Sequence, residues 1–483
     1  MTGPPFLDAL RRALPGRVLG LGSVPGVDNG RVRLAPACTV RPGSADDIGT
    51  TLRFARDEGL PLTVRGGGHS TAGYCLNRTG VVLDMSSMRG VRLDADRQTV
   101  RVGGGARWQD IHPHLRGDRQ GLIAVGCSSP QVGVAGALLG GGLSFTSRAH
   151  GLGSDNVTAI ELVLANGARA RVEEHSVSPA DRELFWACRG GGGGNFGVVT
   201  AVELRLHRPR TEHMFGGQIV FPLRRAPEIL PLYGEWTAAL PDTLAAYLHI
   251  SNRRDTHERT RRLWAMTVTV IHDGAREEAT ELLRPLLTAG PLRAWSATAP
   301  LHDWEARVGA ASAVAHRLAY IRSGVLPARA FTPDFVNTVC DFMPRSPSPE
   351  SFLLWVHTGG RMATAPEAGA YPHRSSGSIY ELKSIWRDEA AARANVTWAY
   401  DFGEALRPHS TGAYVNQHDP LLTGWRTAYH GPHYDRLVAV KRRVDPTRVL
   451  RFPQAIGSTY EPPGTSPPDL HLLDPDPARL RGR

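Results

Sequence analysis

The chain has 483 residues, of which 41% are hydrophobic and 7% aromatic, values typical of a globular enzyme with two or three domains. Its formal net charge of +10 comes almost wholly from arginine, because Lys383 and Lys441 are the only lysines, and the arginines are scattered rather than clustered. We therefore expect no nucleic-acid partner, and the lack of any apolar run of ~18 residues leads us to expect no membrane span and a cytoplasmic location.

The N-terminal region predicts a β-α-β unit. Residues 1–35 indicate a helix and an arm, and residues 37–41 a short strand. Ser44 is a good N-cap for a helix that Gly59 ends, and residues 60–64 form the next strand. Such a unit places whatever follows its last strand at the edge where open α/β layers bind ligands.

A glycine loop follows that strand, with the sequence Arg65-Gly66-Gly67-Gly68-His69-Ser70. A backbone without β-carbons can lie directly against a ligand and present the ring of His69 to it. A surface turn that carries an incidental histidine gives the same local pattern, so the loop needs support from elsewhere in the chain.

Two further glycine clusters supply that support. Strands at 81–84 and 99–102 and a helix at 106–115 precede the first cluster, at 126–153, which contains Gly133, Gly136, Gly140, Gly141 and Gly142. A strand at 156–164, a turn at Asn166-Gly167, a strand at 168–172 and a helix at 181–188 precede the second, at 189–197. A strand at 198–206 follows.

The second cluster matches GxGxxG at Gly192, Gly194 and Gly197, the fingerprint of a Rossmann nicotinamide site. That fingerprint must follow a strand and open a helix, whereas here a helix-like segment precedes it and a strand follows, so we reject this interpretation. Three separate clusters instead indicate one extended cofactor whose pyrophosphate is bound by backbone N–H groups.

From about residue 211 the glycine clusters end, and eight of the ten tryptophans lie beyond this point. Strand-like runs at 214–221, 244–251, 265–271 and 352–357 alternate with helix-like runs at 275–287 and 388–406. This pattern indicates an α/β layer with an aromatic face suited to an organic substrate. A helix is expected at 434–444, and residues 459–483 are expected to form a disordered tail.

Three blocks of sequence resemble one family. RGGGHS, PQVGVAGALLGGGLSFTSRAHGLGSDNV and RGGGGGNFGVVT are similar to the FAD-binding domain of vanillyl-alcohol-oxidase-type flavoproteins, among which the berberine-bridge-enzyme-like oxidases fit best. The similarity covers 36–207 and resumes at 370–374 and 412–456.

The resemblance implies an α+β fold of the PCMH type, in which a two-subdomain FAD domain at 1–210 is completed by a C-terminal return at 411–458. A substrate domain with an antiparallel sheet would occupy 211–410. It also implies FAD linked through its 8α-methyl group to His69. The residues expected to bind FAD are Arg65, Gly66, Gly67, Gly68, His69, Ser70, Cys127, Ser129, Val132, Gly133, Gly136, Gly140, Gly141, Gly142, Gly194, Asn195, Gly197, Val199 and Gln454.

Cys127 departs from the family pattern. Many members attach the flavin a second time, through a cysteine directly before a Pro-x-Val-Gly run, but here Ser129 holds that position and Cys127 stands two places upstream. Either the loop is remodelled so that Cys127 reaches the flavin, or the histidyl bond is alone; we expect the single bond. The five cysteines have no CxxC spacing, so neither a disulfide framework nor a metal site is expected.

The resemblance also suggests catalytic residues. Tyr414 matches a tyrosine that faces the substrate side of the flavin, and positive charge from His373 and Arg374 would have to lower its pKa for it to act as a base near neutrality. A core tyrosine with a satisfied hydroxyl is the alternative. Asn416 is a further catalytic candidate, with His418 and Asp401 as secondary ones, while Gln417 stands where relatives often have an aromatic residue.

We thus expect an FAD-dependent oxidoreductase acting on a small molecule, with O2 as electron acceptor and H2O2 as product. Val132 matches a position near the flavin edge where a small aliphatic residue resembles oxygen-reactive members. A dehydrogenase with another acceptor, acting on a sugar or alcohol, and a non-catalytic flavin-binding protein are the alternatives. The substrate is expected to be a natural product that loses hydride from an alcohol or from a C–H or N–H site. The sequence leaves the oligomeric state open.

Overall fold

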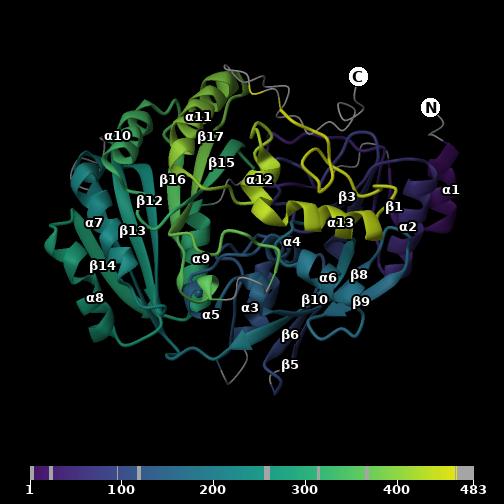
Figure 1. The fold of residues 1–483 in the computed structure, drawn as a ribbon, viewed down its shortest axis with the longest axis horizontal. Coiled ribbons are helices and arrows are strands. Elements are labelled where there is room, and N and C mark those ends of the chain that lie inside the picture. The colour runs from purple at the N-terminus through teal and green to yellow at the C-terminus, as the bar shows by residue number, and fades with distance from the viewer. Residues whose placement is uncertain are drawn as a thin grey trace.

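Three β-sheets organise the molecule, which is known from a computed structural model (Figure 1). The structure describes residues 5–20, 26–94, 96–116, 121–254, 262–312, 316–364, 369–462 and 464. Two of the sheets lie in the N-terminal half, and the third, larger sheet is built from the chain after residue 213. The expected α+β fold is confirmed.

The first sheet has four strands in the order β1-β2-β4-β3. These are β1 (Val18–Leu19), β2 (Cys38–Val40), β3 (Leu62–Arg65) and β4 (Val81–Asp84), and helices α1 (Pro5–Ala13) and α2 (Ala45–Asp57) pack on it. Ser44 caps α2 as predicted, since its hydroxyl accepts the N–H of Asp47 at 3.2 Å. β3 and β2 both run parallel to β4, so the loop after Arg65 leaves the carboxyl edge of this sheet.

The second sheet is antiparallel, with the order β5-β6-β10-β8-β9 and β7 paired to β10. Its strands are β5 (Val91–Asp94), β6 (Thr99–Gly103), β7 (Ile123–Ala124), β8 (Val157–Val163), β9 (Arg169–Glu173) and β10 (Val198–His207). Four helices are interspersed, namely α3 (Trp108–Arg116), α4 (Val134–Leu139), α5 (Ser147–His150) and α6 (Pro179–Ala187). The predicted glycine clusters are the connections that lead into α4 and β10.

The third sheet has seven antiparallel strands in the order β14-β11-β13-β12-β16-β17-β15. They are β11 (Met214–Pro222), β12 (Leu244–Arg254), β13 (Arg262–His272), β14 (Arg293–Ala299), β15 (Leu318–Leu326), β16 (Phe352–His357) and β17 (Ser378–Trp386). Helices α7 (Ala226–Ala238), α8 (Arg276–Thr288), α10 (Pro333–Phe342) and α11 (Ala392–Leu406) bury one face.

The other face of this sheet carries Tyr247, Ile321, Leu354 and Val356 and packs with α9 (Leu301–Ser312) and Phe145 of the N-terminal half. Strand alternation explains the division, because Leu248 and Leu353 belong to the helix-covered core while their neighbours Tyr247 and Leu354 do not. This face, called the uncovered face below because none of α7, α8, α10 and α11 packs on it, is turned toward the glycine loops.

The C-terminal segment returns to the N-terminal half, where α12 (Trp425–His430) and α13 (Tyr434–Val444) lie in Figure 1. The Lys441 ammonium is buried in α13 and donates to the carbonyls of Asn195 and Leu450 at 2.6 and 2.8 Å and to Asp445 at 2.7 Å. Leu62 of β3 donates to the carbonyl of Val449 at 2.9 Å. Most of the segment predicted as a disordered tail, residues 463 and 465–483, lies outside the described residues.

Candidate functional site

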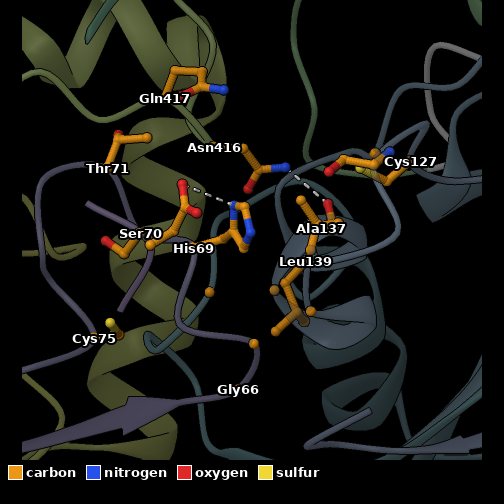
Figure 2. Close-up of a pocket in the computed structure, with 18 of the residues that line it drawn as sticks. Gly66, His69, Ser70, Thr71, Cys75, Cys127, Ala137, Leu139, Asn416 and Gln417 are labelled. Carbon is orange, nitrogen blue, oxygen red and sulfur yellow. Dashed lines mark hydrogen bonds and ion pairs between the residues drawn. The ribbon is translucent and has the colours of Figure 1, made fainter. Parts of the chain in front are cut away.

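A cavity of about 330 Å³ lies between the glycine loops and the uncovered face of the seven-stranded sheet. Its lining includes most of the residues that the sequence singled out, namely Gly66, Gly67, Gly68, His69, Ser70, Cys127, Ser129, Val132, Gly133, Gly136, Gly142, Gly194, Gly197, Val199, Tyr414 and Asn416. Figure 2 shows the His69 ring and the Asn416 side chain near the middle of this space.

The loop after β3 approaches the glycine cluster at 126–153 backbone to backbone. A β-carbon on Gly67 would collide with the N atom of Gly133, and Gly68 has φ +78°, a conformation that favours glycine. The N–H groups of Gly67, Gly68 and His69 donate to no acceptor in the described part of the chain. A run of unpaired N–H groups at a cavity wall is suited to bind an anionic group.

Two glycines leave open space at the cavity wall. A β-carbon added to Gly136, in the middle of α4, would meet no atom within 4 Å. One added to Gly194 would meet only a ring carbon of Phe452, at 3.5 Å, and Gly194 has φ +75°. Bare backbone at both positions allows a flat ligand to approach closely.

His69 extends from its loop toward the cavity centre (Figure 2). Burial lowers the pKa of its imidazole, and the carboxylate of Asp28, 3.8 Å from Nδ1, opposes this effect. Lys383 and Arg107 add to the lowering. A histidine with a lowered pKa is a neutral imidazole near neutrality, and its free ring nitrogen can act as a nucleophile.

Cys127 also lines the cavity, and its sulfur accepts the N–H of Ser129 at 3.4 Å. Burial raises the pKa of this thiol to about 12, so the sulfur is protonated near neutral pH. A thiol is a much weaker nucleophile than a thiolate. Near neutral pH, His69 is therefore the better nucleophile of the two residues.

Tyr414 and Asn416 form a hydrogen-bonded pair against the glycine cluster at 126–153. The Tyr414 hydroxyl oxygen accepts the N–H of Gly142 at 3.1 Å and an amide N–H of Asn416 at 2.9 Å. Asn416 also donates to the carbonyl of Ala137 at 2.9 Å. Both donors lower the pKa of Tyr414, but burial outweighs them and raises it above its ordinary value.

The expectation that His373 and Arg374 lower the pKa of Tyr414 is wrong. Neither lines the cavity. Burial lowers the pKa of His373 to about 4, so the ring is neutral, and it bonds the carbonyl of Ala428 at 2.9 Å. The guanidinium of Arg374 forms a bidentate pair with Asp155, at 2.6 and 2.9 Å, which offsets its charge. Tyr371 packs between His373 and Tyr414, with its ring edge-on to both.

Further residues that the sequence predicted to bind FAD or act in catalysis also lie outside the cavity lining, namely Arg65, Gly140, Gly141, Asn195, Asp401 and Gln454. Arg65 pairs with Asp84 at 3.0 Å, and the Gln454 amide donates to the carbonyl of Asp419 at 2.8 Å. The Asn195 amide donates to carbonyls of its own loop, and its oxygen accepts the N–H of Ile456 at 2.9 Å. The side chains of Arg65, Asn195 and Gln454 therefore stabilise the loops instead of lining the cavity.

Sequence reasoning missed three charged residues of the cavity: Asp28, which lies beside His69, and the pair Glu381 and Lys383 in β17. Glu381 and Lys383 form an ion pair at 3.0 Å, and the Gln417 amide donates to the other Glu381 oxygen at 3.0 Å. Charged residues two apart in an otherwise apolar strand lie on one face, which is the signal that could have found this pair. Figure 2 labels Gln417 at the cavity rim near Thr71.

The residues fit an FAD, a ligand with both a flat ring and a pyrophosphate. Unpaired N–H groups and bare glycine backbone supply the contacts that such a ligand needs. The hydroxyl of Tyr74 lines the cavity and is buried without a hydrogen-bond partner among the described residues, as is the amide oxygen of Gln417. Buried polar atoms are normally satisfied, so these two are available to a bound group.

Comparison with known families agrees with this fit. Residues 36–173 match the family described as FAD binding domain, and residues 413–457 match the family described as berberine and berberine like. The two matches bracket the cavity, because the first contains the His69 loop and the second contains Tyr414 and Asn416. No cluster of three or more potential metal ligands and no helix able to span a membrane occurs within the described residues.

Over most of its length the chain is also similar to a named enzyme and to proteins of solved structure. The chain is 29% identical over 456 residues to (R)-6-hydroxynicotine oxidase of Paenarthrobacter nicotinovorans, covering 89% of this chain and 93% of that one. Chitooligosaccharide oxidase shares the fold with a TM-score of 0.81 at 21% identity, over 95% and 99% of the two chains. The wild-type Phl p 4.0202, a glucose dehydrogenase, does so with a TM-score of 0.80 at 21% identity, over 94% and 99%.

Proposed function

Since the chain belongs to the berberine-bridge-enzyme-like FAD-dependent oxidoreductases, we propose that it is an oxidase that removes hydride from an alcohol or amine carbon of a partly apolar small molecule. The observation that carries this proposal is that the glycine loops and the seven-stranded sheet line one cavity. In it, the predicted flavin cradle faces a sheet surface that bears one carboxylate–ammonium pair, Glu381 and Lys383, among apolar side chains.

FAD would be held by the three glycine loops and attached through His69. The neutral imidazole of His69 supplies the nucleophilic nitrogen, and the carboxylate of Asp28 lies 3.8 Å from Nδ1. Cys127 remains a free thiol in this proposal, because burial keeps its proton in place. Bound there, FAD would supply two-electron redox chemistry, with hydride accepted from the substrate and the electrons returned to O2 as H2O2.

The substrate proton goes to Glu381. An alcohol carbon that loses hydride becomes a carbonyl carbon only when the O–H proton also leaves, so a base must lie in the cavity. The Glu381 carboxylate is within the lining, and it pairs with the Lys383 ammonium 3.0 Å away. Tyr414, whose pKa is raised, instead serves as a hydrogen-bond donor, because its own proton has no acceptor among the described residues.

The cavity wall formed by the seven-stranded sheet indicates the substrate class through its shape and polarity. Tyr247, Ile321, Leu354 and Val356 form an apolar wall, and Phe145 stacks on Tyr247 with ring centroids 4.2 Å apart. Such a wall favours a ring or aliphatic body with one polar reacting end directed at Glu381. This is consistent with a relative named for a hydroxynicotine substrate, although other relatives are named for sugars.

Val132 supports oxygen as the electron acceptor. Its side chain lines the cavity between Ser129 and Gly133, where the family resemblance places the flavin edge that oxygen approaches. Since Phl p 4.0202 is named a dehydrogenase, the acceptor has to be measured. Stopped-flow mixing of the substrate-reduced protein with O2 tests it: reoxidation at least as fast as turnover supports the oxidase, and slower reoxidation identifies a dehydrogenase.

The matched variant is Val132→Ile, which adds one methyl group at this wall. We expect slower reoxidation by O2 with unchanged anaerobic reduction by substrate. An equal loss in both half-reactions would mean that the larger side chain disturbs flavin or substrate binding, and it would remove the support that Val132 gives.

A further inference from the structure

A second cavity, of about 310 Å³, adjoins the flavin loop and shares only Gly66 with the first among their described lining residues. Four arginines line it: Arg41, Arg65, Arg89 and Arg107. Arg65 and Asp84 are buried at its floor, with side chains 8% and 2% exposed, whereas Arg41 and Arg89 are 46% exposed. It is therefore an open hollow with a fixed, charged floor.

Positive charge in this hollow exceeds negative charge. Asp84 is its one lining carboxylate among the described residues, and Arg41 and Arg65 share it, at 3.1 and 3.0 Å. Asp110, which is not part of the lining, pairs with Arg89. Four guanidinium groups against two carboxylates leave about two positive charges uncompensated in the group.

Arg107 contributes most to that excess. Its guanidinium donates to two neutral oxygens, the amide of Gln131 and the carbonyl of Gly67, both at 3.1 Å, and contacts no carboxylate among the described residues. Burial lowers the pKa of Arg107, and the nearby charges of Arg65 and Arg89 lower it further. An anion beside it would relieve this repulsion.

Unused donors are present around the hollow. Nη1 of Arg41, Nη1 of Arg89 and Nε of Arg107 donate to no acceptor within the described ranges, whereas the other nitrogens of Arg41 and Arg89 are taken by carboxylates. Guanidinium groups bind phosphate oxygens in well-defined geometry, and a phosphate dianion matches the uncompensated charge.

We propose that this hollow binds a phosphate group, carried either by inorganic phosphate or by a phosphomonoester. The site is distinct from the flavin cradle, whose lining includes Gly67, Gly68 and His69, none of which lines the second cavity. Arg107 connects the two, since it lines the hollow and holds the carbonyl of Gly67. A bound phosphate fixes Arg107 and thereby steadies the loop that carries His69.

Isothermal titration calorimetry on the FAD-containing protein tests the proposal, at constant ionic strength kept with chloride. Inorganic phosphate, adenosine monophosphate and adenosine are titrated separately. We expect one phosphate site per chain, no binding of adenosine, and affinity for phosphate lowered at least about tenfold in Arg89→Gln and in Arg107→Gln. Arg116→Gln is the control, because Arg116 is an exposed arginine of α3 that pairs with Asp303 away from the hollow; its affinity should be unchanged.

The same titrations distinguish inorganic phosphate from a phosphomonoester. Adenosine monophosphate binding at least about tenfold tighter than inorganic phosphate identifies a nucleotide phosphomonoester, and equal affinities identify inorganic phosphate. Circular dichroism confirms that each variant is folded. Absence of phosphate binding to the FAD-containing protein overturns the proposal, as do full affinity in both folded hollow variants and equal binding of adenosine.

Discussion

Nδ1 of His69 lies 3.8 Å from the carboxylate of Asp28, inside the cavity that the glycine loops enclose. Two opposing effects meet at this ring: burial lowers the pKa of His69 and Asp28 raises it, with burial the larger. The balance leaves the imidazole neutral near neutrality, which is the form required to attack a flavin methyl group.

Asp28→Asn should shift the pH dependence of flavin attachment toward acid. Removing the carboxylate takes away the interaction that raises the pKa of His69, so the pKa falls further and the neutral ring persists to lower pH. The measurement is covalent incorporation of FAD into apo-protein across a pH series. A shift toward alkali would show that Asp28 acts by some route other than this charge.

Gly136→Val should give folded protein that lacks flavin. A β-carbon at Gly136 meets no atom within 4 Å, so the side chain fits the protein but fills the cavity wall where the flavin is proposed to lie. The flavin absorbance per mole of protein measures the loss. Gly90→Ala, which also has open space but lies outside the cavity lining, is the control and should keep full flavin content.

Glu381→Gln should lower kcat by about 10²–10⁴-fold, because the amide cannot take the substrate proton. Anaerobic reduction by substrate measures the loss. A variant with wild-type reduction rates would exclude Glu381 as the base and return that role to Tyr414.

Tyr414→Phe should lower the free energy of unfolding by about 1–3 kcal/mol, since the Gly142 N–H and the Asn416 amide lose a buried acceptor. Tyr400→Phe is the control, because no hydrogen bond of the Tyr400 hydroxyl occurs among the described residues. Urea unfolding of the flavin-free proteins compares them. Equal stability of the two variants would mean that water replaces the Tyr414 hydroxyl without cost.

Local signals predicted the flavin cradle well. Short stretches of sequence were enough to predict the N-cap at Ser44, the strand that leads to Arg65 and the three glycine clusters. The structure contains the expected helix α2 and strand β3. The predicted helix at 388–406 begins at Ala392, because Asp388 instead caps a short 3-10 turn. Such shifts at element ends reflect competition between neighbouring caps.

Contacts between residues far apart in the chain could not be predicted from local sequence patterns. Arg374 pairs with Asp155, 219 residues earlier in the chain, so its place in the family-like stretch at 370–374 did not indicate a position beside Tyr414. Glu381 and Lys383 reach the cavity only because β17 lies between β16 and β15 with its uncovered face toward the glycine loops. That placement depends on the register of the whole sheet rather than on any stretch of residues.

The central claim is that FAD is bound at the glycine loops and attached to His69. Acid precipitation of the purified protein followed by peptide mass mapping tests it most directly. The account predicts yellow precipitate, flavin mass on the peptide that contains His69, and an unmodified Cys127 peptide. Flavin released wholly into the supernatant, with an unmodified His69 peptide, would contradict the claim.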